Sequence, residues 1–130
     1  MPIPADPLPR ILVIVRDEPI GEIVVAMLGA AGYQCDALWE HKAILRVLKR
    51  IEKYNLLFCQ VSALEEDKKL LKWALGAGKH IPVVAFAGRS PEGVPKVIYE
   101  RCNFLQAPFD REQLLNFVRE TLKSKNEPGC

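Results

Sequence analysis

The chain has 130 residues, of which 49% are hydrophobic and 26% are charged, which suits one domain with a sizeable core. Its 18 basic and 16 acidic residues leave a formal net charge of +2, which gives no case for nucleic acid or a membrane surface as the partner. No apolar run approaches the roughly 20 residues that a membrane span needs.

The two ends of the chain read as extensions of a central domain over residues 10–123. Residues 1–9 are rich in proline and lack the apolar segment of a secretory signal, so we expect a flexible Pro-rich arm. Residues 124–130 read as a tail or a truncated linker. The four cysteines have no metal-site spacing, and three of them lie in apolar runs, so we expect reduced thiols in a cytoplasmic protein.

Strand and helix patterns alternate from residue 11 onward. Ile11–Val15 is an apolar run typical of a strand that is buried on both faces. A helix is predicted to open at Pro19 and to end at Gly32. Tyr33–Leu38 predicts a second strand, and Glu40–Lys53 predicts an amphipathic helix with a basic face.

The second half of the chain continues the alternation. Proline and glycine crowd residues 90–95, so the helix that follows them is expected to be short. Asp110 is expected to cap the last helix. The elements predicted here are strands at Leu56–Val61, Ile81–Ala87 and Asn103–Gln106, and helices over 64–78, 96–101 and 110–123.

Five strand–helix units with short connections predict an α/β fold in which helices cover both faces of a parallel sheet. Ligand sites in such folds lie beyond the carboxyl ends of the strands. Here that edge comprises residues 16–19, 60–63, 87–90 and 106–109.

These loops and their flanking strands resemble the receiver domain of two-component response regulators, the CheY-like family. The resemblance covers residues 10–123, and it is carried by the order and spacing of four short segments. It implies a flavodoxin-like (βα)5 doubly wound sandwich with a five-stranded parallel sheet of strand order 2-1-3-4-5. The carriers are residues 11–19, the Tyr-Asn-Leu-Leu-Phe run at 54–58, Ile-Pro-Val-Val at 81–84, and residues 103–110.

The family uses two carboxylates for a divalent cation, an aspartate acceptor, a hydroxyl residue and a lysine. The resemblance puts Arg16 and Asp17 at the carboxylate positions and Gln60 at the acceptor position. Ala87 stands at the hydroxyl position and Ala107 at the lysine position. Asp17 alone matches among these five, and it is followed by the matching Glu18 and Pro19.

These departures predict a degenerate phosphorylation pocket. Gln60 has no anionic oxygen that could form an acyl phosphate, and no Asp lies within Leu56–Ala63 to replace it. A hard cation prefers several oxygen ligands, and the guanidinium of Arg16 would repel it by on the order of a few kcal/mol. Arg16 is expected to pair with Asp17 or Glu18, or else to point to solvent. We therefore expect no metal, no cofactor and no enzymatic activity.

Two further positions follow from the resemblance. Phe104 stands where the family has an aromatic switch, and it either stays inward permanently or simply packs within its strand. The peptide bond before Pro108 is expected to be cis. For the missing hydroxyl, Ser62 and Ser90 stay open as replacements, although neither restores an acceptor.

The resulting hypothesis is a pseudo-receiver that acts by phosphorylation-independent protein–protein contact, with homodimerisation as one option. Nucleic acid would be bound only through an output domain that this sequence lacks. The alternatives are a working receiver with a non-standard acceptor, or a small-molecule-binding flavodoxin-like domain. The contact face implied by the resemblance comprises residues 96–101, 103–106 and 110–123, with Val97, Tyr99, Phe104, Arg111 and Arg119 as candidates.

Overall fold

The computed structural model describes residues 9–50, 53–77 and 81–124. Residues 1–8 of the expected arm, residues 125–130 of the expected tail, and Cys130 with them, lie outside these ranges. The elements in chain order are β1 (Arg10–Ile14), α1 (Glu18–Ala30), β2 (Gln34–Leu38), α2 (His41–Leu48), β3 (Leu56–Gln60), α3 (Val61–Glu66), α4 (Lys68–Ala77), β4 (Val83–Ala87), a 3-10 turn (Pro91–Gly93), α5 (Lys96–Arg101), β5 (Asn103–Gln106) and α6 (Arg111–Ser124).

The strands form one parallel sheet in the order β2-β1-β3-β4-β5. This confirms the expected α/β architecture and strand order. The chain runs from β1 outward to β2 and then crosses to β3 on the other side of β1. Because β1, β3 and β4 lie inside the sheet, their apolar residues are buried on both faces, as their apolar runs predict, and only the end residues Arg10 and Gln60 are partly exposed.

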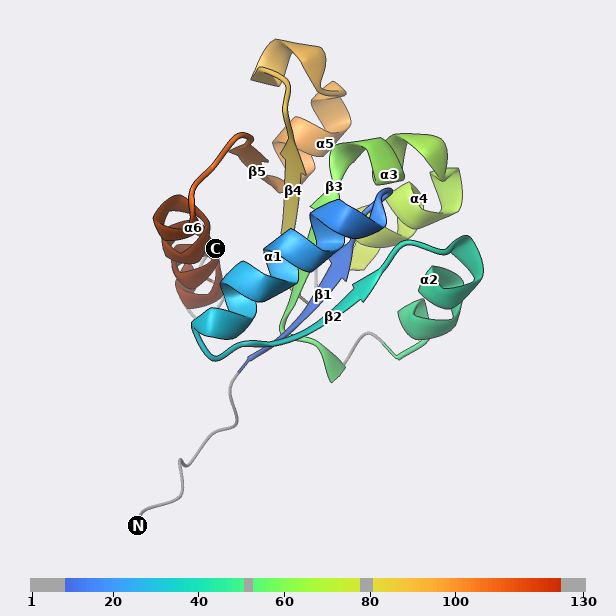
Figure 1. Cartoon of the computed structure of the whole chain (residues 1–130). Helices are drawn as coiled ribbons and strands as arrows, with labels where there is room; N and C mark the ends of the chain where they lie inside the picture. Colours follow the sequence, from blue (N-terminus) through green and yellow to red (C-terminus); the bar gives the residue numbers. More distant parts are fainter. Residues whose placement is uncertain (1–8, 51–52, 78–80, 125–130) are drawn as a thin grey trace.

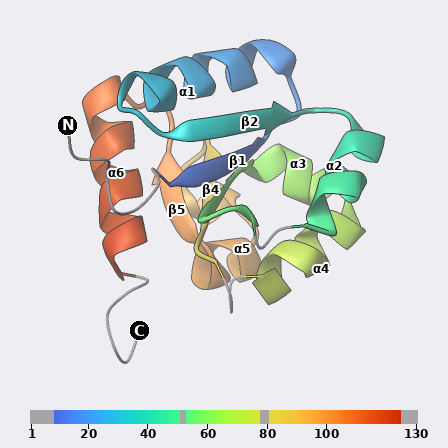
Figure 2. The ribbon, with the colours of Figure 1, turned by 90° about the horizontal axis from the view of Figure 1, so that it is seen from below.

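Two apolar cores cover the two faces of the sheet. Helices α1 and α6 cover one face, and α2 to α5 cover the other (Figures 1 and 2). Successive strand residues alternate between the cores, so Leu57 and Cys59 pack under α2 to α5 while Phe58 packs under α1 and α6. This alternation decides which side chains at the strand ends face which helix layer.

Helix α1 lies very close to β1. Gly21 is buried there, and a Cβ atom at this position would come 2.9 Å from Cγ2 of Val15. Gly32 follows the helix with a φ of 98°, a left-handed conformation that glycine adopts without steric cost, and it ends α1 as predicted. The two glycines therefore set how close α1 lies and where it stops.

Two predicted helices differ from the observed ones. The helix expected over 64–78 is two helices, because Asp67 adopts an extended conformation and its Oδ1 accepts hydrogen bonds from the backbone N–H groups of Lys69 (2.9 Å) and Leu70 (3.1 Å). Asp67 thus caps a new helix, α4. The helix expected over Glu40–Lys53 ends at Leu48, where the chain tightens into a turn closed by the hydrogen bond from Arg50 N to Val47 O.

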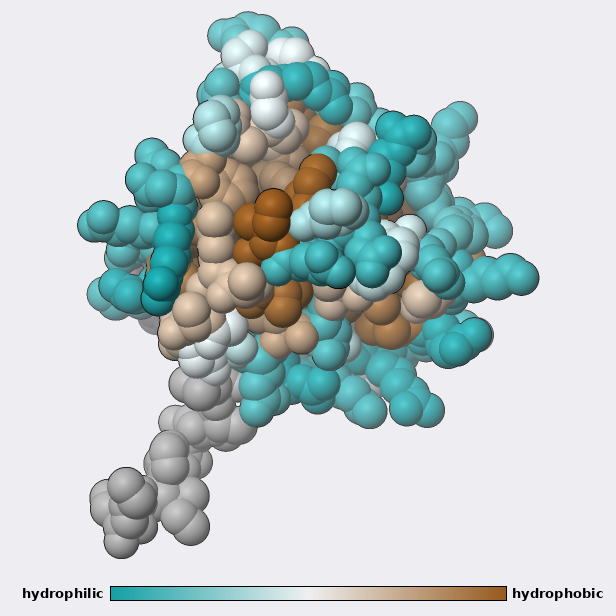
Figure 3. All heavy atoms as spheres, in the orientation of Figure 1, coloured by the Kyte–Doolittle hydropathy of each residue, from teal (hydrophilic) through white to brown (hydrophobic). Residues whose placement is uncertain are grey.

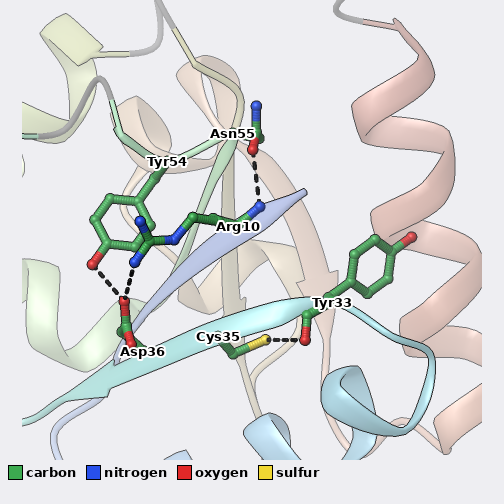
Figure 4. A network of polar contacts seen from close by, with 6 residues as sticks. All are labelled: Arg10, Tyr33, Cys35, Asp36, Tyr54 and Asn55. Atoms are coloured by element: carbon green, nitrogen blue, oxygen red, sulfur yellow. Dashed lines mark hydrogen bonds and ion pairs between the residues drawn. The ribbon is translucent and has the colours of Figure 1, made fainter. Parts of the chain in front are cut away.

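A polar network ties β1, β2 and the residue pair before β3 together (Figure 4). The Tyr54 hydroxyl donates to Oδ2 of Asp36 at 2.7 Å, and Nη2 of Arg10 contacts the same oxygen at 3.3 Å. The Arg10 guanidinium also lies 5.3 Å from the centre of the Tyr54 ring, a cation–π arrangement. Asn55 Oδ1 accepts from the backbone N–H of Arg10 at 2.9 Å. Together these contacts bind β2, an edge strand, to β1 and to the start of β3.

Across the part of the chain that the structure describes, no helix combines the length and the apolarity needed to cross a membrane.

Candidate functional site

The loops that follow β1, β3, β4 and β5 meet at one edge of the sheet, where the sequence predicted a site (Figure 1). Two hydrogen bonds link them in pairs. Gln60 Oε1 accepts from the backbone N–H of Arg16 at 2.8 Å, and the carbonyl of Ala87 accepts from the backbone N–H of Ala107 at 2.7 Å. These four site positions therefore lie beside one another in two bonded pairs.

Gln60 is the last residue of β3, and its side chain is fixed by Arg16. The preceding residue, Cys59, is fully buried on the other face of the sheet, and burial raises the pKa of its thiol well above the usual value. The only side chain that β3 presents to the loop of residues 16–19 is thus a neutral amide. It can donate and accept hydrogen bonds, and it carries no nucleophilic oxygen anion.

Arg16 forms an ion pair with Glu66 at the end of α3, with 2.7 Å between Nη2 and Oε1. The expectation that Arg16 pairs with Asp17 or Glu18 is therefore wrong. The reason is geometric, because α3 starts directly after β3 and carries Glu66 to the loop after β1. Both side chains are about half exposed, so the pair contributes little to stability.

Asp17 and Glu18 are exposed at the start of α1. Asp17 occupies the N-cap position, yet its side chain makes no capping hydrogen bond. Within residues 9–50, 53–77 and 81–124, no group of three or more His, Cys, Asp or Glu side chains is arranged to hold a metal ion. The acidic pair alone offers a cation few of the oxygen ligands that Mg²⁺ prefers.

A cavity of about 370 Å³ adjoins Gln60, Ala87 and Ala107. It lies on the α1 side of the sheet, and Phe86 and Phe109 form part of its wall. These two rings pack edge to face with centres 5.9 Å apart, and Phe58 stacks on Phe86 at 4.8 Å. The wall on this side is therefore a rigid aromatic cluster of the core.

A second hollow of about 590 Å³ lies on the other side of Arg16, between the start of α2 and the junction of α3 with α4. His41 Nδ1 contacts Asp67 Oδ2 there at 2.7 Å, and the Arg16–Glu66 pair forms part of the same wall. Sequence reasoning missed Glu66 and Asp67 as neighbours of Arg16. The available signal was the acidic run at 65–67, which follows β3 closely.

The loop after β4 is anchored to α3. The guanidinium of Arg89 pairs with the Glu65 carboxylate, and its Nη1 donates to the carbonyl of Gly93 at 2.9 Å. The hydrogen bond to Arg89 lowers the pKa of Glu65 below its usual value. Of the two serines left open as hydroxyl replacements, Ser62 lies within α3 and Ser90 is exposed beyond Arg89.

The candidates for a contact face fall into two groups. Val97 and Tyr99 are exposed on α5, at 40% and 47%, and the Tyr99 ring lies 5.7 Å from the ring of Phe104 in β5. Phe104 is half-buried and packs against the core under α2 to α5. Arg111 and Arg119 both line one shallow groove along α6.

The peptide bond between Ala107 and Pro108 is cis, as expected from the resemblance. Directly after it, Asp110 and Gln113 form a reciprocal cap of α6, in which Asp110 Oδ1 accepts from Gln113 N (2.7 Å) and Gln113 Oε1 accepts from Asp110 N (2.9 Å). The predicted cap at Asp110 is confirmed.

Solved structures of receiver-type proteins share the fold of this chain. A response regulator receiver domain protein (CheY-like) from Methanospirillum hungatei JF-1 matches with a TM-score of 0.75 at 17% identity, over 94% of this chain and 99% of that one. A response regulator receiver protein from Burkholderia phymatum matches with a TM-score of 0.73 at 20% identity, over 88% and 95%. The receiver domain of the hybrid histidine kinase CckA matches with a TM-score of 0.65 at 23% identity, over 87% and 98%.

The fold is the CheY-like fold of receiver domains. NtrX from Brucella abortus, solved in complex with ADP, matches at 19% identity with a TM-score of 0.72, and this chain spans 26% of its length. No protein-family model matches the sequence, and no curated protein matches it either.

Proposed function

We propose that this chain is a receiver-type signalling module that works without aspartyl phosphorylation, through contact with a partner protein. The observation that carries the proposal is the engaged amide of Gln60 at the end of β3, where the receiver family has its acceptor aspartate. A side chain without an anionic oxygen cannot attack phosphorus there, so the step that starts a receiver's switch has no nucleophile.

The surrounding positions support the same reading. Arg16 puts a guanidinium where the family has a metal-binding carboxylate, and this group is held by Glu66. Ala87 and Ala107 supply neither the hydroxyl nor the ammonium that would bind phosphoryl oxygens. The loops keep the shape of a receiver. Of the five side chains that receivers use for phosphorylation, only Asp17 is present.

Function then rests on surface recognition, and α5 with β5 offers the best-supported surface. Val97 and Tyr99 are two of the few large apolar side chains that the described residues expose. Aromatic residues with nearby arginines are enriched at the centres of protein interfaces. We propose that Val97, Tyr99 and Phe104, together with Arg111 and Arg119 on α6, form the contact face for a protein partner or a second copy.

A titration with beryllofluoride and Mg²⁺ tests the first part of the proposal. Beryllofluoride mimics a phosphoryl group on an acceptor aspartate, so we expect no shift of the NMR signals of residues 16–19, 60–63 and 87–90. A saturable shift of these signals would contradict the proposal.

A double variant tests the second part. Tyr99→Ala combined with Arg119→Ala removes an aromatic ring and a cation from the proposed face, and we expect recovery of the partner in a pull-down, or self-association on sedimentation, to fall at least tenfold. The matched control is Trp39→Ala combined with Arg46→Ala, which removes the same two chemistries near α2, where Trp39 and Arg46 are also exposed. Equal recovery with both double variants would contradict the proposal that this face binds the partner.

A further inference from the structure

The cavity beside Gln60 has an apolar lining, which is unusual at this edge of the sheet. It is the position at which receivers handle a phosphoryl group, yet a hollow of about 370 Å³ with a mainly hydrophobic lining opens to the surface there. Ile20, Ile23 and Met27 of α1 form one wall, and Phe86 and Phe109 contribute to the opposite side. Gln60 is the one polar side chain of the lining, and no lining side chain is charged.

Small residues keep this space open. Ala87, Gly88 and Ala107 line the cavity from the strand ends, and they extend no further than a Cβ atom. A Cβ atom added at Gly88 would meet no heavy atom within 4 Å. The missing hydroxyl and lysine side chains have therefore left room that the neighbouring residues do not fill.

The mouth of the cavity continues into an apolar area of the surface. Figure 3 shows hydrophobic side chains gathered over α1 and beside it, with hydrophilic side chains on either side. Ile23 lines the cavity and is 57% exposed, so its side chain contacts water along much of its length. An occupant would remove this apolar surface from water, which is favourable.

Gln60 supplies a polar anchor with a fixed orientation. Its Oε1 accepts from the Arg16 backbone, which holds the amide in place. Nε2, on the other side of the amide, makes no hydrogen bond with a described residue, and because no buried side-chain nitrogen or oxygen of the described residues lacks a partner, its two N–H donors are open to water. Binding pockets for small molecules have this composition, an apolar lining with a few placed polar groups, and they lie at the carboxyl ends of strands in α/β folds.

The charges in and around the cavity determine which class of ligand it can bind. The lining offers no cation to an anionic ligand, and the carboxylates of Asp17 and Glu18 are exposed at the start of α1. A negatively charged group would lose its hydration and gain no counter-charge. We propose that this cavity binds a neutral, largely apolar small molecule with one hydrogen-bond acceptor that meets Nε2 of Gln60. This ligand site goes beyond the proposed partner contact, and its lining shares no residue with the proposed contact face.

Three small compounds of similar shape test the proposal by NMR titration of the full chain. Acetophenone is neutral and has one carbonyl acceptor, ethylbenzene lacks the acceptor, and benzoate carries a negative charge. We expect acetophenone to shift the signals of residues 20–27, 86–88 and 107–109 with saturation in the millimolar range or below. Ethylbenzene should bind several-fold more weakly, and benzoate at least tenfold more weakly.

Three variants test whether the ligand binds in this cavity. Ile23→Glu introduces a charge at the mouth and should weaken acetophenone binding at least tenfold. Ala26→Glu introduces the same charge on the same helix at an exposed position outside the lining, and it should leave binding unchanged. Gln60→Glu keeps the acceptor for Arg16 N and removes the N–H donors, so the preference for acetophenone over ethylbenzene should disappear.

Several results would overturn the proposal. They are the absence of saturable shifts in the cavity residues, binding of benzoate as tight as that of acetophenone, or an equal loss with Ile23→Glu and Ala26→Glu. None of these results bears on the beryllofluoride titration or on the Tyr99 double variant. The ligand site and the proposed function can therefore fail separately.

Discussion

At the scale of single residues, Gln60 and Arg16 stand at two positions that are acidic in the receiver pattern. Each of the two residues makes a polar contact with a neighbouring residue. The amide of Gln60 bonds the Arg16 backbone, and the Arg16 side chain bonds Glu66. Gln60→Asp would remove the amide oxygen that now accepts from the Arg16 backbone N–H, and the Arg16 guanidinium would still oppose a cation. We therefore expect Gln60→Asp alone to bind no Mg²⁺, which a paramagnetic Mn²⁺ titration can check.

Tyr54 gives a prediction on pH. Burial, together with the hydrogen bond to Asp36, raises the pKa of Tyr54 from 10 to about 12. The unfolded chain therefore loses this proton first as the pH rises, so the stabilisation by Tyr54 is complete below about pH 10 and disappears toward pH 12. Tyr54→Phe should lower the free energy of unfolding by about 1 kcal/mol at pH 8.

Comparing the free energy of unfolding of wild type and of Tyr54→Phe across pH separates the contribution of the Tyr54 hydroxyl from those of other titrating groups. Burial also raises the pKa of Cys35 and of Cys102 to about 11, and these thiols destabilise both proteins equally at alkaline pH. In urea unfolding at pH 8 to 12, the difference between wild type and Tyr54→Phe should shrink above pH 10. A difference that stays constant to pH 12 would contradict the proposed role of the hydroxyl.

At the scale of elements, the close contact of α1 with β1 depends on Gly21. Gly21→Ala places a Cβ atom 2.9 Å from Cγ2 of Val15, so the helix or the Val15 side chain must move. We expect a loss of about 1–3 kcal/mol in the free energy of unfolding. Gly29→Ala on the same helix is the matched control, since its Cβ would meet nothing within 4 Å, and it should stabilise by about 0.5–1 kcal/mol. Opposite signs in urea unfolding are the expected result, and a shared sign would contradict this packing.

The break between α3 and α4 depends on the cap at Asp67. Asp67→Ala removes the acceptor of two backbone N–H groups and the contact with His41, and it should cost about 1–2 kcal/mol. Glu66→Ala removes a neighbouring carboxylate that makes only an exposed ion pair, so its cost should stay below about 1 kcal/mol. Thermal unfolding of both variants compares these effects directly, and an equal loss in both would argue against the cap.

Sequence patterns predict a strand or helix well where its position depends on the burial of apolar side chains. Apolar runs locate β1, β3 and β4, and the cap at Asp110 follows from its residue type. The single helix expected over 64–78 was wrong because the charged run at 65–69 reads as the start of one helix, whereas Asp67 is extended and caps a second helix. The partner of Arg16 was wrong for another reason, since Glu66 is distant in sequence and is brought near by the direct passage from β3 into α3.

The cavity beside Gln60 could not be predicted from sequence. Its lining comes from α1, from the ends of β3 and β4 and from the loop around Pro108, and its volume depends on how small residues at separate positions face one another. The resemblance to receivers did identify Ala87 and Ala107 as positions without functional groups. It did not indicate that their small size leaves an apolar space.

At the scale of the whole molecule, the edge loops lie at the end of a three-layer sandwich of helices, sheet and helices. Both faces of the sheet are covered, and the described residues contain no buried side-chain nitrogen or oxygen without a hydrogen-bond partner. The edge loops are therefore held by packing and by the hydrogen bonds between Arg16 and Gln60 and between Ala87 and Ala107.

Intact-mass measurement after incubation with acetyl phosphate and Mg²⁺ tests the central claim most directly. The wild-type chain should keep its mass, because no carboxylate stands at the end of β3. A variant with Arg16→Asp, Gln60→Asp, Ala87→Thr and Ala107→Lys restores the missing groups, and we expect it to gain one phosphoryl group that hydroxylamine removes. A hydroxylamine-sensitive gain of one phosphoryl group by the wild-type chain would contradict the account.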